Sequence, residues 1–375
     1  MEKLQEQAQA LADLAVKEGL QGALQFCAFK DGKCVVDVCA GAMTTDAGAP
    51  RVDGATLFPI FSTEKPLLAT AVHRTIEQGK LDYDTPVSAF WPEFTGAGKE
   101  KLTVRELLGY RSGMPDNKSD VALSPEGTRT MADWPGMLDW FASVPPDITP
   151  GTTQRYMALS YGWAHGGILE KIWKKPANDV LRELVLIPAG IENDFFFVCG
   201  DAEIPRIATV YKSEAFESMN DDLARRSFLP SVWAVSTARG VAQFYNRLCG
   251  FDGQPPLIRK ETLDAALVPC RHESDPVPDA EGLKAWHMIF GMGYGLWGEA
   301  DNLSRVFGHG GLGGSEGLCD RSQRLAIGYT CNFDNAPPKL REAFYSLAGM
   351  RWRYRRDDVN IQDLQMATMT DHPRC

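Results

Sequence analysis

The sequence has 375 residues, of which 44% are hydrophobic and 23% are charged, and its formal net charge is −10. This length and composition are typical of a globular protein with a large core, and they leave room for two lobes. The acidic balance, with no basic stripe, argues against nucleic acid and anionic membranes as partners.

Neither a membrane span nor a metal or cofactor site is predicted. No segment approaches about 18 uninterrupted apolar residues, and the charged first six residues lack the apolar core of a secretory signal. The nine cysteines contain no Cys-x-x-Cys pair, and the six histidines show no metal-ligand spacing. We therefore expect a cytoplasmic protein with reduced thiols, no metal and no cofactor, and leave its oligomeric state open.

The chain is expected to open with a helix and two antiparallel strands. Residues 2–18 carry apolar side chains at helical spacing, and residues 23–29 and 34–38 are β-rich. Between them, Asp31-Gly32 is a strong hairpin signal. A loop over 41–55 follows.

Helices joined by long loops are expected from residue 62 to residue 250. Pro, Gly, Asp and Thr make the stretch 112–153 look like a loop-rich cover. Thr103 is a plausible cap for one helix, and Ser236 or Thr237 for another. The predicted helices are 67–78, 103–108, 159–173, 178–187 and 235–248.

After residue 250 the pattern returns to strands. A helix over 260–267 precedes three β-like runs at 292–297, 305–309 and 316–332, the last folded at 320–323. A final helix is expected over 338–353, and residues 356–375 are expected to form a tail.

This order predicts an α/β (α+β) fold in one domain over 1–355. One antiparallel sheet, flanked by terminal helices, is expected from residues 1–61 and 251–355. Residues 62–250 are expected to form an all-helical lobe. A site would lie between the two lobes, where Ser62 marks the crossing.

Ser62 and Lys65 are the first candidate catalytic pair. If a helix begins at Ser62 or Thr63, their spacing places hydroxyl and amine one turn apart on one face. A desolvated lysine can accept the serine proton, and the helix N-terminus offers N–H groups to an oxyanion. The alternative is a helix-capping Ser62 beside a solvated Lys65. Glu64 is expected to interact with the helix dipole.

Two later segments contain further candidates. Tyr156 stands just before a predicted helix, where buried packing is the alternative to catalysis. His309-Gly310-Gly311, followed by Leu312, allows a ligand to approach backbone N–H groups closely, although such glycines also mark crowded strand edges. No helix with Lys-Ser/Thr follows, so a phosphate loop is excluded.

Taken together, these segments resemble the serine β-lactamase and penicillin-binding-protein superfamily. More narrowly, they are similar to the β-lactamase-related serine hydrolases that include the family VIII carboxylesterases. The likeness runs from about residue 23 to about residue 348. The segments that carry it are 61–66, 79–82 with Pro86-Val87, 102–115, 150–161, 236–239 and 307–332.

The resemblance implies a role for each candidate. Ser62 would be the acylated nucleophile, Lys65 its proton acceptor or electrostatic partner, and Tyr156 a general base or proton relay. The backbone N–H groups of Ser62 and Leu312 would form the oxyanion hole. His309, with Gly310 and Gly311, occupies the place of Lys-Thr-Gly, where it would polarise the site or, when protonated, bind a substrate carboxylate.

Two departures from the family pattern favour esters. Ala158 stands where β-lactamases carry an asparagine, and His309 replaces the lysine that attracts the β-lactam carboxylate. The sequence therefore predicts a carboxylesterase acting on small esters through an acyl-Ser62 intermediate. Acyl transfer, D-amino-acid peptide or amide hydrolysis and weak β-lactamase activity are the enzymatic alternatives. A catalytically silent binding scaffold is the non-enzymatic one.

Overall fold

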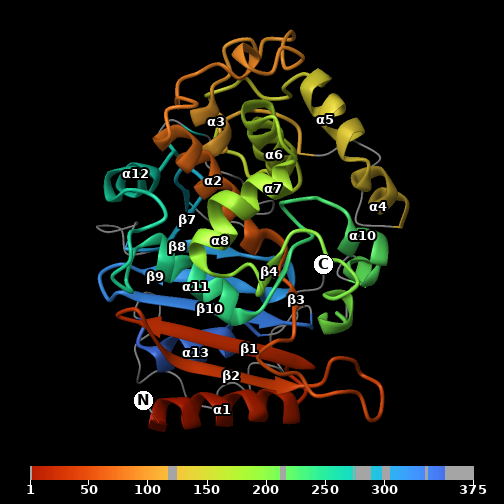
Figure 1. The fold of residues 1–375 in the computed structure, drawn as a ribbon, viewed down its shortest axis with the longest axis vertical. Coiled ribbons are helices and arrows are strands. Elements are labelled where there is room, and N and C mark those ends of the chain that lie inside the picture. The colour runs from red at the N-terminus through yellow and green to blue at the C-terminus, as the bar shows by residue number, and fades with distance from the viewer. Residues whose placement is uncertain are drawn as a thin grey trace.

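A seven-stranded antiparallel sheet is built from both ends of the chain (Figure 1). The computed structural model describes residues 2–116, 125–211, 217–272, 275, 289–297, 305–333 and 337–350. In spatial order the strands are β2 (Lys33–Gly41), β1 (Ala23–Lys30), β10 (Leu325–Cys331), β9 (Glu316–Asp320), β8 (Val306–Gly310), β7 (Gly295–Trp297) and β6 (Ile289–Phe290). The predicted antiparallel sheet, shared between the two ends of the chain, is confirmed.

The predicted hairpin joins β1 and β2. Asp31 and Gly32 both adopt positive φ angles, 51° and 79°, as a tight two-residue turn between twisted strands requires. The register shifts at Ala28 and Phe29, which face Val36 and Cys34, so Val35 forms a bulge. β1 also pairs with β10, and this pairing fixes the two ends of the chain side by side.

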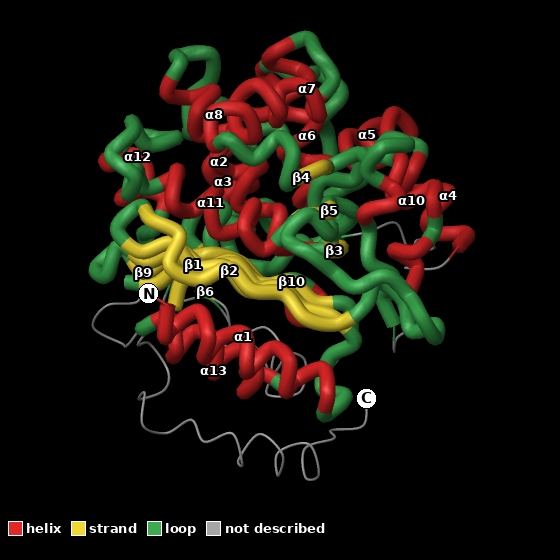
Figure 2. The backbone as a smooth tube through the Cα atoms, turned by 60° about the horizontal axis from the view of Figure 1, so that its bottom comes forward, coloured by secondary structure: helices red, strands yellow, loops and turns green. Residues whose placement is uncertain are grey.

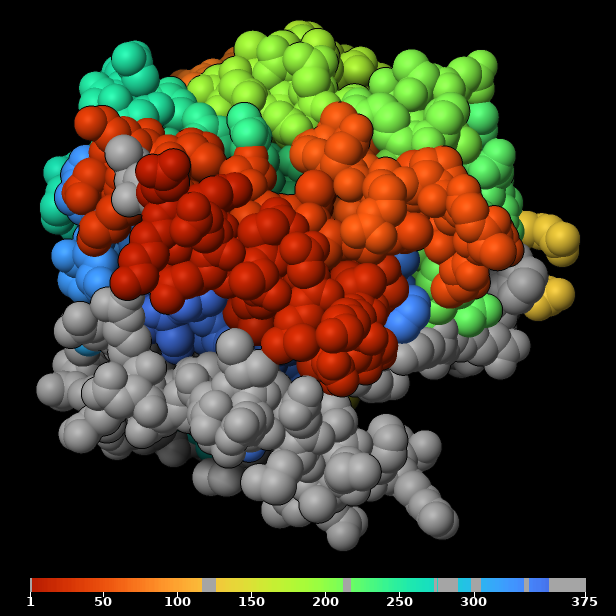
Figure 3. All heavy atoms as spheres, turned by 90° about the horizontal axis from the view of Figure 1, so that it is seen from below, coloured from red at the N-terminus to blue at the C-terminus, as the bar shows by residue number. Residues whose placement is uncertain are grey.

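Two terminal helices cover one face of this sheet (Figure 2). α1 (Glu2–Lys17) buries Ala8, Leu11, Ala12 and Ala15 against it, and α13 (Pro338–Ala348) buries Leu340 and Phe344. Seen from below, N-terminal residues, coloured red, form a large part of the coloured surface (Figure 3). α13 ends at Gly349, whose φ of 96° suits glycine. The predicted tail lies outside the described residues.

Helix α11 (Ala238–Leu248) covers the opposite face, against β1, β9 and β10. Helix α11 lies very close to the sheet because the sheet residues that face it include glycines. A Cβ atom on Gly328 would lie 2.2 Å from the carbonyl oxygen of Ala238, and one on Gly317 would lie 2.5 Å from Val241. Thr237 caps α11 by accepting from Gly240 N–H, as predicted.

The middle of the chain is mainly helical and lies on the α11 side of the sheet (Figure 1). Its largest apolar cluster includes residues of α2 and α6, which contact each other, and extends to Phe307 of the sheet. The helices here are α2 (Lys65–Glu77), α3 (Val104–Leu108), α4 (Pro125–Ala132), α5 (Trp134–Ser143), α6 (Ser160–Trp173), α7 (Ala177–Leu181), α8 (Ile187–Ala189), α10 (Asp222–Arg226) and α12 (Lys260–Ala266). A small sheet joins β3 (Phe58–Pro59), β5 (Val235–Ser236) and β4 (Phe195–Phe196). The division into two lobes at residues 62 and 250 stays a prediction.

Three local predictions were wrong in detail. The stretch 112–153 contains α4 and α5, and α5 starts with a Pro in its first turn behind the capping Asp133. Residues 235–236 form β5, and the helix begins after them, because both residues pair with neighbouring strands. The helix expected over 178–187 is interrupted by a π-helical turn.

Within the described ranges, no helix is both long enough and apolar enough to cross a bilayer. A cytoplasmic location stays a prediction.

The close approach of α11 to the sheet makes Gly328 sensitive to substitution. In Gly328→Ala the new methyl group would meet the Ala238 backbone, so we expect the free energy of unfolding to fall by about 1–3 kcal/mol. Urea unfolding of the two proteins measures this loss. Gly54→Ala is the matched control, since its new methyl group would enter open space, with no surrounding atom within 4 Å. Equal unfolding midpoints for the two variants would contradict the packing described above.

Candidate active site

Ser62 lies in a tight turn at the start of the helical region. The residues Phe61–Glu64 form a 3-10 helix, η1, and α2 begins only at Lys65, with Pro66 in its first turn. The α-helix therefore begins between Ser62 or Thr63, the start considered for the catalytic pair, and residue 67, where the predicted helix begins. Ser62 and Lys65 still share a face, because a 3-10 helix has three residues per turn.

The residue before Ser62 has an unusual backbone conformation. Phe61 is buried and has a φ of 47°, in the left-handed region that bulky side chains rarely adopt. Such a conformation costs about 1–3 kcal/mol and persists only where the surrounding structure imposes it. Packing of Phe61 in the main apolar cluster holds the turn that presents Ser62.

Lys65 is fully buried, and three oxygen atoms surround its amine. Nζ lies 2.8 Å from the Ser62 hydroxyl, the Ala158 carbonyl and the Ser231 carbonyl. Burial lowers the pKa of Lys65 to about 7, against the opposing charges of Glu64 and Asp116. A neutral amine here would donate its two N–H groups to the two carbonyls. Its lone pair would then face the Ser62 hydroxyl.

Tyr156 also interacts with the Ser62 hydroxyl. Burial raises the pKa of Tyr156 far above its usual range, and a side-chain hydrogen bond with Ser62 partly lowers it. Lys65 Nζ lies 5.3 Å from the centre of the Tyr156 ring. Phe290 stacks on that ring with the centroids 5.4 Å apart. The structure thus brings together the three residues predicted as catalytic.

The end of β8 contacts the turn that contains Ser62. A Cβ atom on Gly311 would lie 2.1 Å from the carbonyl oxygen of Ile60, and Thr63 Oγ1 donates to the carbonyl of Ser315 at 2.9 Å. Leu312 opens the short 3-10 helix η6 (Leu312–Gly314). First-turn amides have no acceptor within their own helix. The segments that supply the amides of Ser62 and Leu312 are therefore in contact.

His309 is buried beside Tyr156, and their ring centroids are 5.8 Å apart. Burial and the charge of Lys65 lower its pKa to about 3, so the imidazole is neutral at neutral pH. Its Nδ1 lies 2.6 Å from the carbonyl of Gly310, which assigns the proton to Nδ1. Nε2 is buried and finds no hydrogen-bond partner among the described residues. Burial keeps His309 uncharged. It therefore favours the predicted polarising role over the predicted binding of a substrate carboxylate, which needs a protonated imidazole.

Glu64 has a larger part in the site than its predicted interaction with the helix dipole. Its side chain is fully buried, and Oε2 accepts a 2.6 Å hydrogen bond from the N–H of Ala234. The same loop supplies the Ser231 carbonyl that accepts from Lys65. Burial raises the pKa of Glu64 well above its usual range, opposed by Lys65. Its place between two apolar segments, 57–61 and 66–69, was the available sign of burial.

Asp116 was missed because no motif contains it. Its Oδ1 accepts from the N–H groups of Leu159 and Ser160, at 2.9 and 3.3 Å, and so caps the start of α6. Ala158, whose carbonyl binds Lys65, directly precedes these residues. Asp116 thus fixes one of the two carbonyl acceptors of the amine.

Comparison with known proteins agrees with the resemblance seen in the sequence. The sequence model of the family described as Beta-lactamase matches residues 8–349. "Esterase/beta-lactamase LipL" of Mycobacterium tuberculosis is 25% identical over 337 residues, covering 81% of this chain and 75% of that protein. "Esterase EstB" of Burkholderia gladioli is 30% identical over 218 residues, covering 54% of this chain and 53% of that protein.

Solved structures share the fold. A family VIII carboxylesterase superposes with a TM-score of 0.77 at 25% identity, covering 92% of this chain and 97% of that one. A penicillin-binding-protein homologue from Caulobacter crescentus superposes with a TM-score of 0.74 at 22% identity, covering 89% and 93%. These matches confirm the predicted β-lactamase-like fold.

The capping role of Asp116 predicts a specific loss of stability. Asp116→Ala removes the carboxylate acceptor of the Leu159 amide, whereas the Ser160 amide keeps the Asp116 backbone carbonyl at 3.0 Å, and we expect the free energy of unfolding to fall by about 1 kcal/mol. Asp116→Asn keeps an acceptor oxygen and is expected to lose less than half of that. Chemical unfolding of both variants tests this, with Asp133→Ala, which uncaps α5, as a comparison. Identical losses for the Ala and Asn variants would show that capping is not the role of Asp116.

Proposed function

The chain belongs to the beta-lactamase family, and we propose that it is a serine hydrolase that cleaves small carboxylic esters through an acyl-Ser62 intermediate. The observation that carries the proposal is the buried Lys65 amine, 2.8 Å from the Ser62 hydroxyl, with two carbonyls to hold its protons. A serine hydroxyl needs an adjacent base to become a nucleophile, and a lysine with a pKa near neutrality is suited to this.

Acylation would begin with transfer of the Ser62 proton to Lys65. The Ser62 oxygen would attack the ester carbonyl, and the N–H groups of Ser62 and Leu312 would stabilise the resulting oxyanion. Tyr156, hydrogen-bonded to Ser62, would relay a proton to the leaving alcohol. Lys65 is the source of that proton.

Deacylation would use the same groups in reverse. Water would occupy the place left by the alcohol, and Tyr156 and Lys65 would accept its proton as it attacks the acyl-Ser62 carbonyl. His309 would contribute as a neutral, polarising group, with its buried Nε2 as a hydrogen-bond acceptor.

Two features favour an ester over an amide or β-lactam substrate. The carbonyl of Ala158 is already bound by Lys65, and its methyl side chain offers no hydrogen bond to a substrate amide. His309 is neutral and so lacks the charge that would attract a substrate carboxylate. A site built without such polar partners gains little from binding an amide. Acyl transfer remains compatible with the same acyl-enzyme.

Removal of the nucleophile is the direct test. Ser62→Ala is expected to lower ester turnover by about a thousandfold or more while preserving the fold, because the acyl group then has no acceptor. Intact mass after brief mixing with p-nitrophenyl acetate, p-nitrophenyl butyrate and a chromogenic cephalosporin should show an acyl adduct from the esters in the wild type alone. Ser143→Ala removes an exposed serine and serves as the control, with unchanged turnover.

Each other result of this experiment points to a different function. An undiminished rate in pure Ser62→Ala would refute the proposal. A stable adduct from the cephalosporin alone would indicate penicillin binding. Ester formation with an added alcohol would indicate acyl transfer, and the lack of any adduct would indicate a binding scaffold.

The charge state of Lys65 predicts the pH dependence. If neutral Lys65 is the base, kcat/KM rises with pH and levels off above a pKa of about 7. The charge of Glu64 raises the pKa of Lys65, so Glu64→Gln should move the acidic limb of the profile to lower pH. The Gln side chain retains an acceptor for the Ala234 amide. Glu93→Gln, at an exposed ion pair with Lys171, should leave the limb in place. Coincident limbs in Glu64→Gln and wild type would contradict this coupling.

A further inference from the structure

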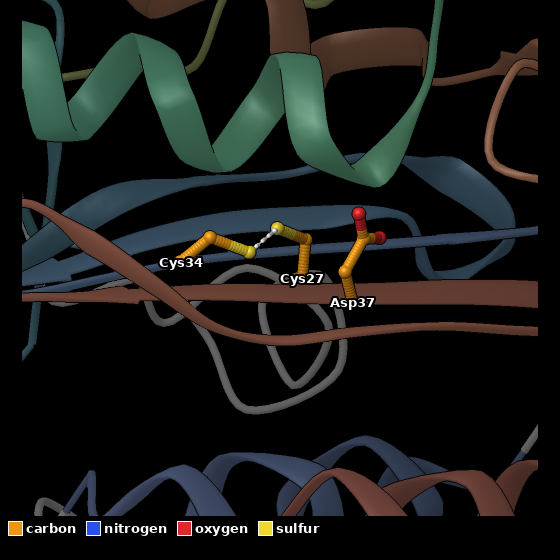
Figure 4. Close-up of side chains that lie close together, drawn as sticks. All are labelled: Cys27, Cys34 and Asp37. Carbon is orange, nitrogen blue, oxygen red and sulfur yellow. Dashed lines mark hydrogen bonds between the residues drawn. The ribbon is translucent and has the colours of Figure 1, made fainter. Parts of the chain in front are cut away.

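A pair of cysteines lies on the β1–β2 hairpin, on the face covered by α11 (Figure 4). The sulfur atoms of Cys27 and Cys34 are 3.9 Å apart. In the register Cys27 faces Asp37 and Phe29 faces Cys34, so the two cysteines are diagonal neighbours on one face. The bulge at Val35 lies beside Cys34. No part of the proposed esterase site involves this pair.

The two thiols differ in exposure and in acidity. Cys34 is exposed, whereas Cys27 is fully buried. The side-chain hydrogen bond from Cys27 lowers the pKa of Cys34 below its usual range. Burial raises the pKa of Cys27 well above its own. An accessible, more acidic thiol with a second thiol behind it is the arrangement of an oxidisable pair.

The third residue of the cluster, Asp37, already has an ion-pair partner. A carboxylate oxygen of Asp37 lies within 4.8 Å of both sulfur atoms, and the three side chains together have ligand atoms for a metal. Asp37 is however paired with Arg239 of α11. Metal binding would have to break this ion pair, whereas reaction between the two sulfur atoms leaves it intact.

We propose that Cys27 and Cys34 form a peroxide-sensitive thiol pair, in which Cys34 is oxidised first and Cys27 then closes a disulfide with it. The Cys34 thiolate attacks one oxygen of hydrogen peroxide, the O–O bond breaks, and hydroxide leaves to become water. Cys34 is thereby oxidised to a sulfenic acid and the peroxide is reduced. The Cys27 sulfur then attacks Cys34 Sγ, the S–O bond breaks, and the departing oxygen takes the Cys27 proton as a second water.

The geometry requires only a local movement. The sulfur atoms must approach from 3.9 Å to about 2.05 Å, the length of a disulfide bond. Cys34 lies beside the bulge, where the ladder is locally disrupted. Burial keeps Cys27 mainly as the thiol, which attacks more slowly than a thiolate would, so the sulfenic acid is a transient species that a trapping reagent can reach before the disulfide closes.

A second close pair of cysteines allows the effect of exposure on oxidation to be distinguished from the effect of the sulfur–sulfur distance. Cys249 and Cys319 have their sulfur atoms 3.6 Å apart, closer than the first pair. Cys319 is buried and Cys249 is half-buried, so neither is exposed. Distance alone would make this pair oxidise first, whereas exposure makes Cys27–Cys34 oxidise first.

The test treats the full-length protein with hydrogen peroxide and a chelator, and follows it by intact mass and disulfide peptide mapping. We expect a loss of two hydrogen atoms and a Cys27–Cys34 cross-link, formed about tenfold faster than a Cys249–Cys319 cross-link. Dimedone, which traps sulfenic acids, should label Cys34. Cys27→Ala should abolish the cross-link and increase dimedone labelling and overoxidation of Cys34 severalfold.

Two controls keep the result interpretable. Cys34→Ser changes an exposed side chain and should abolish both the cross-link and the labelling, with an unchanged circular dichroism spectrum. Cys39→Ser, on the same strand β2, should change neither. Earlier oxidation of Cys249–Cys319, or equal dimedone labelling of Cys34 and Cys39, would overturn the proposal. Labelling of Cys34 without any cross-link would overturn the role of Cys27.

Discussion

The buried amine of Lys65 is the constraint on which the site depends. An ammonium group removed from water costs several kcal/mol unless oxygen atoms replace its hydration shell. Here three oxygens do so, and they come from segments far apart in the chain: the Ser62 turn, Ala158 before α6, and Ser231 before β5. The amine is thus held in place only when all three segments are correctly packed.

Other residues hold the oxygen atoms around Lys65 in position. Asp116 fixes the backbone that follows Ala158, and Glu64 binds the amide of Ala234 in the loop that contains Ser231. The lack of a side chain at Gly311 lets the end of β8 approach the carbonyl of Ile60, just before the turn. A carboxylate that accepts from a backbone N–H is well suited to this task, because the bond is short and directional.

The sequence analysis succeeded where an element depends on residues close to it in the chain, and it failed where the element depends on distant residues. The hairpin at Asp31-Gly32 and the cap at Thr237 depend on neighbouring residues, and both were predicted. The same local rules missed β5, because Val235 and Ser236 are held by pairing with distant strands. Helix α5 had a local start signal in Asp133 and a following proline, which the loop-like composition around it concealed.

The residues of the candidate site likewise fall into those that a short motif identifies and those that depend on distant segments. Ser62, Lys65, Tyr156 and the glycines after His309 are found in short motifs, so a resemblance could identify them. Asp116 and Glu64 act through backbone amides of distant segments, and nothing in their immediate sequence specifies those partners. The burial of His309, which decides its charge, is likewise a property of the packed rings around it.

The ionisable groups around Ser62 share one electrostatic tendency, which bears on the choice of substrate. Burial shifts Lys65, Tyr156 and His309 each toward its uncharged form, and for Glu64 the same effect of burial is opposed by Lys65. A site of this kind offers little compensation for desolvating a charged substrate, whereas a neutral ester loses little hydration on entry. Negative charge then develops only on the carbonyl oxygen during attack, next to backbone amides that need no reorganisation. The same burial that makes Lys65 a usable base therefore favours neutral substrates.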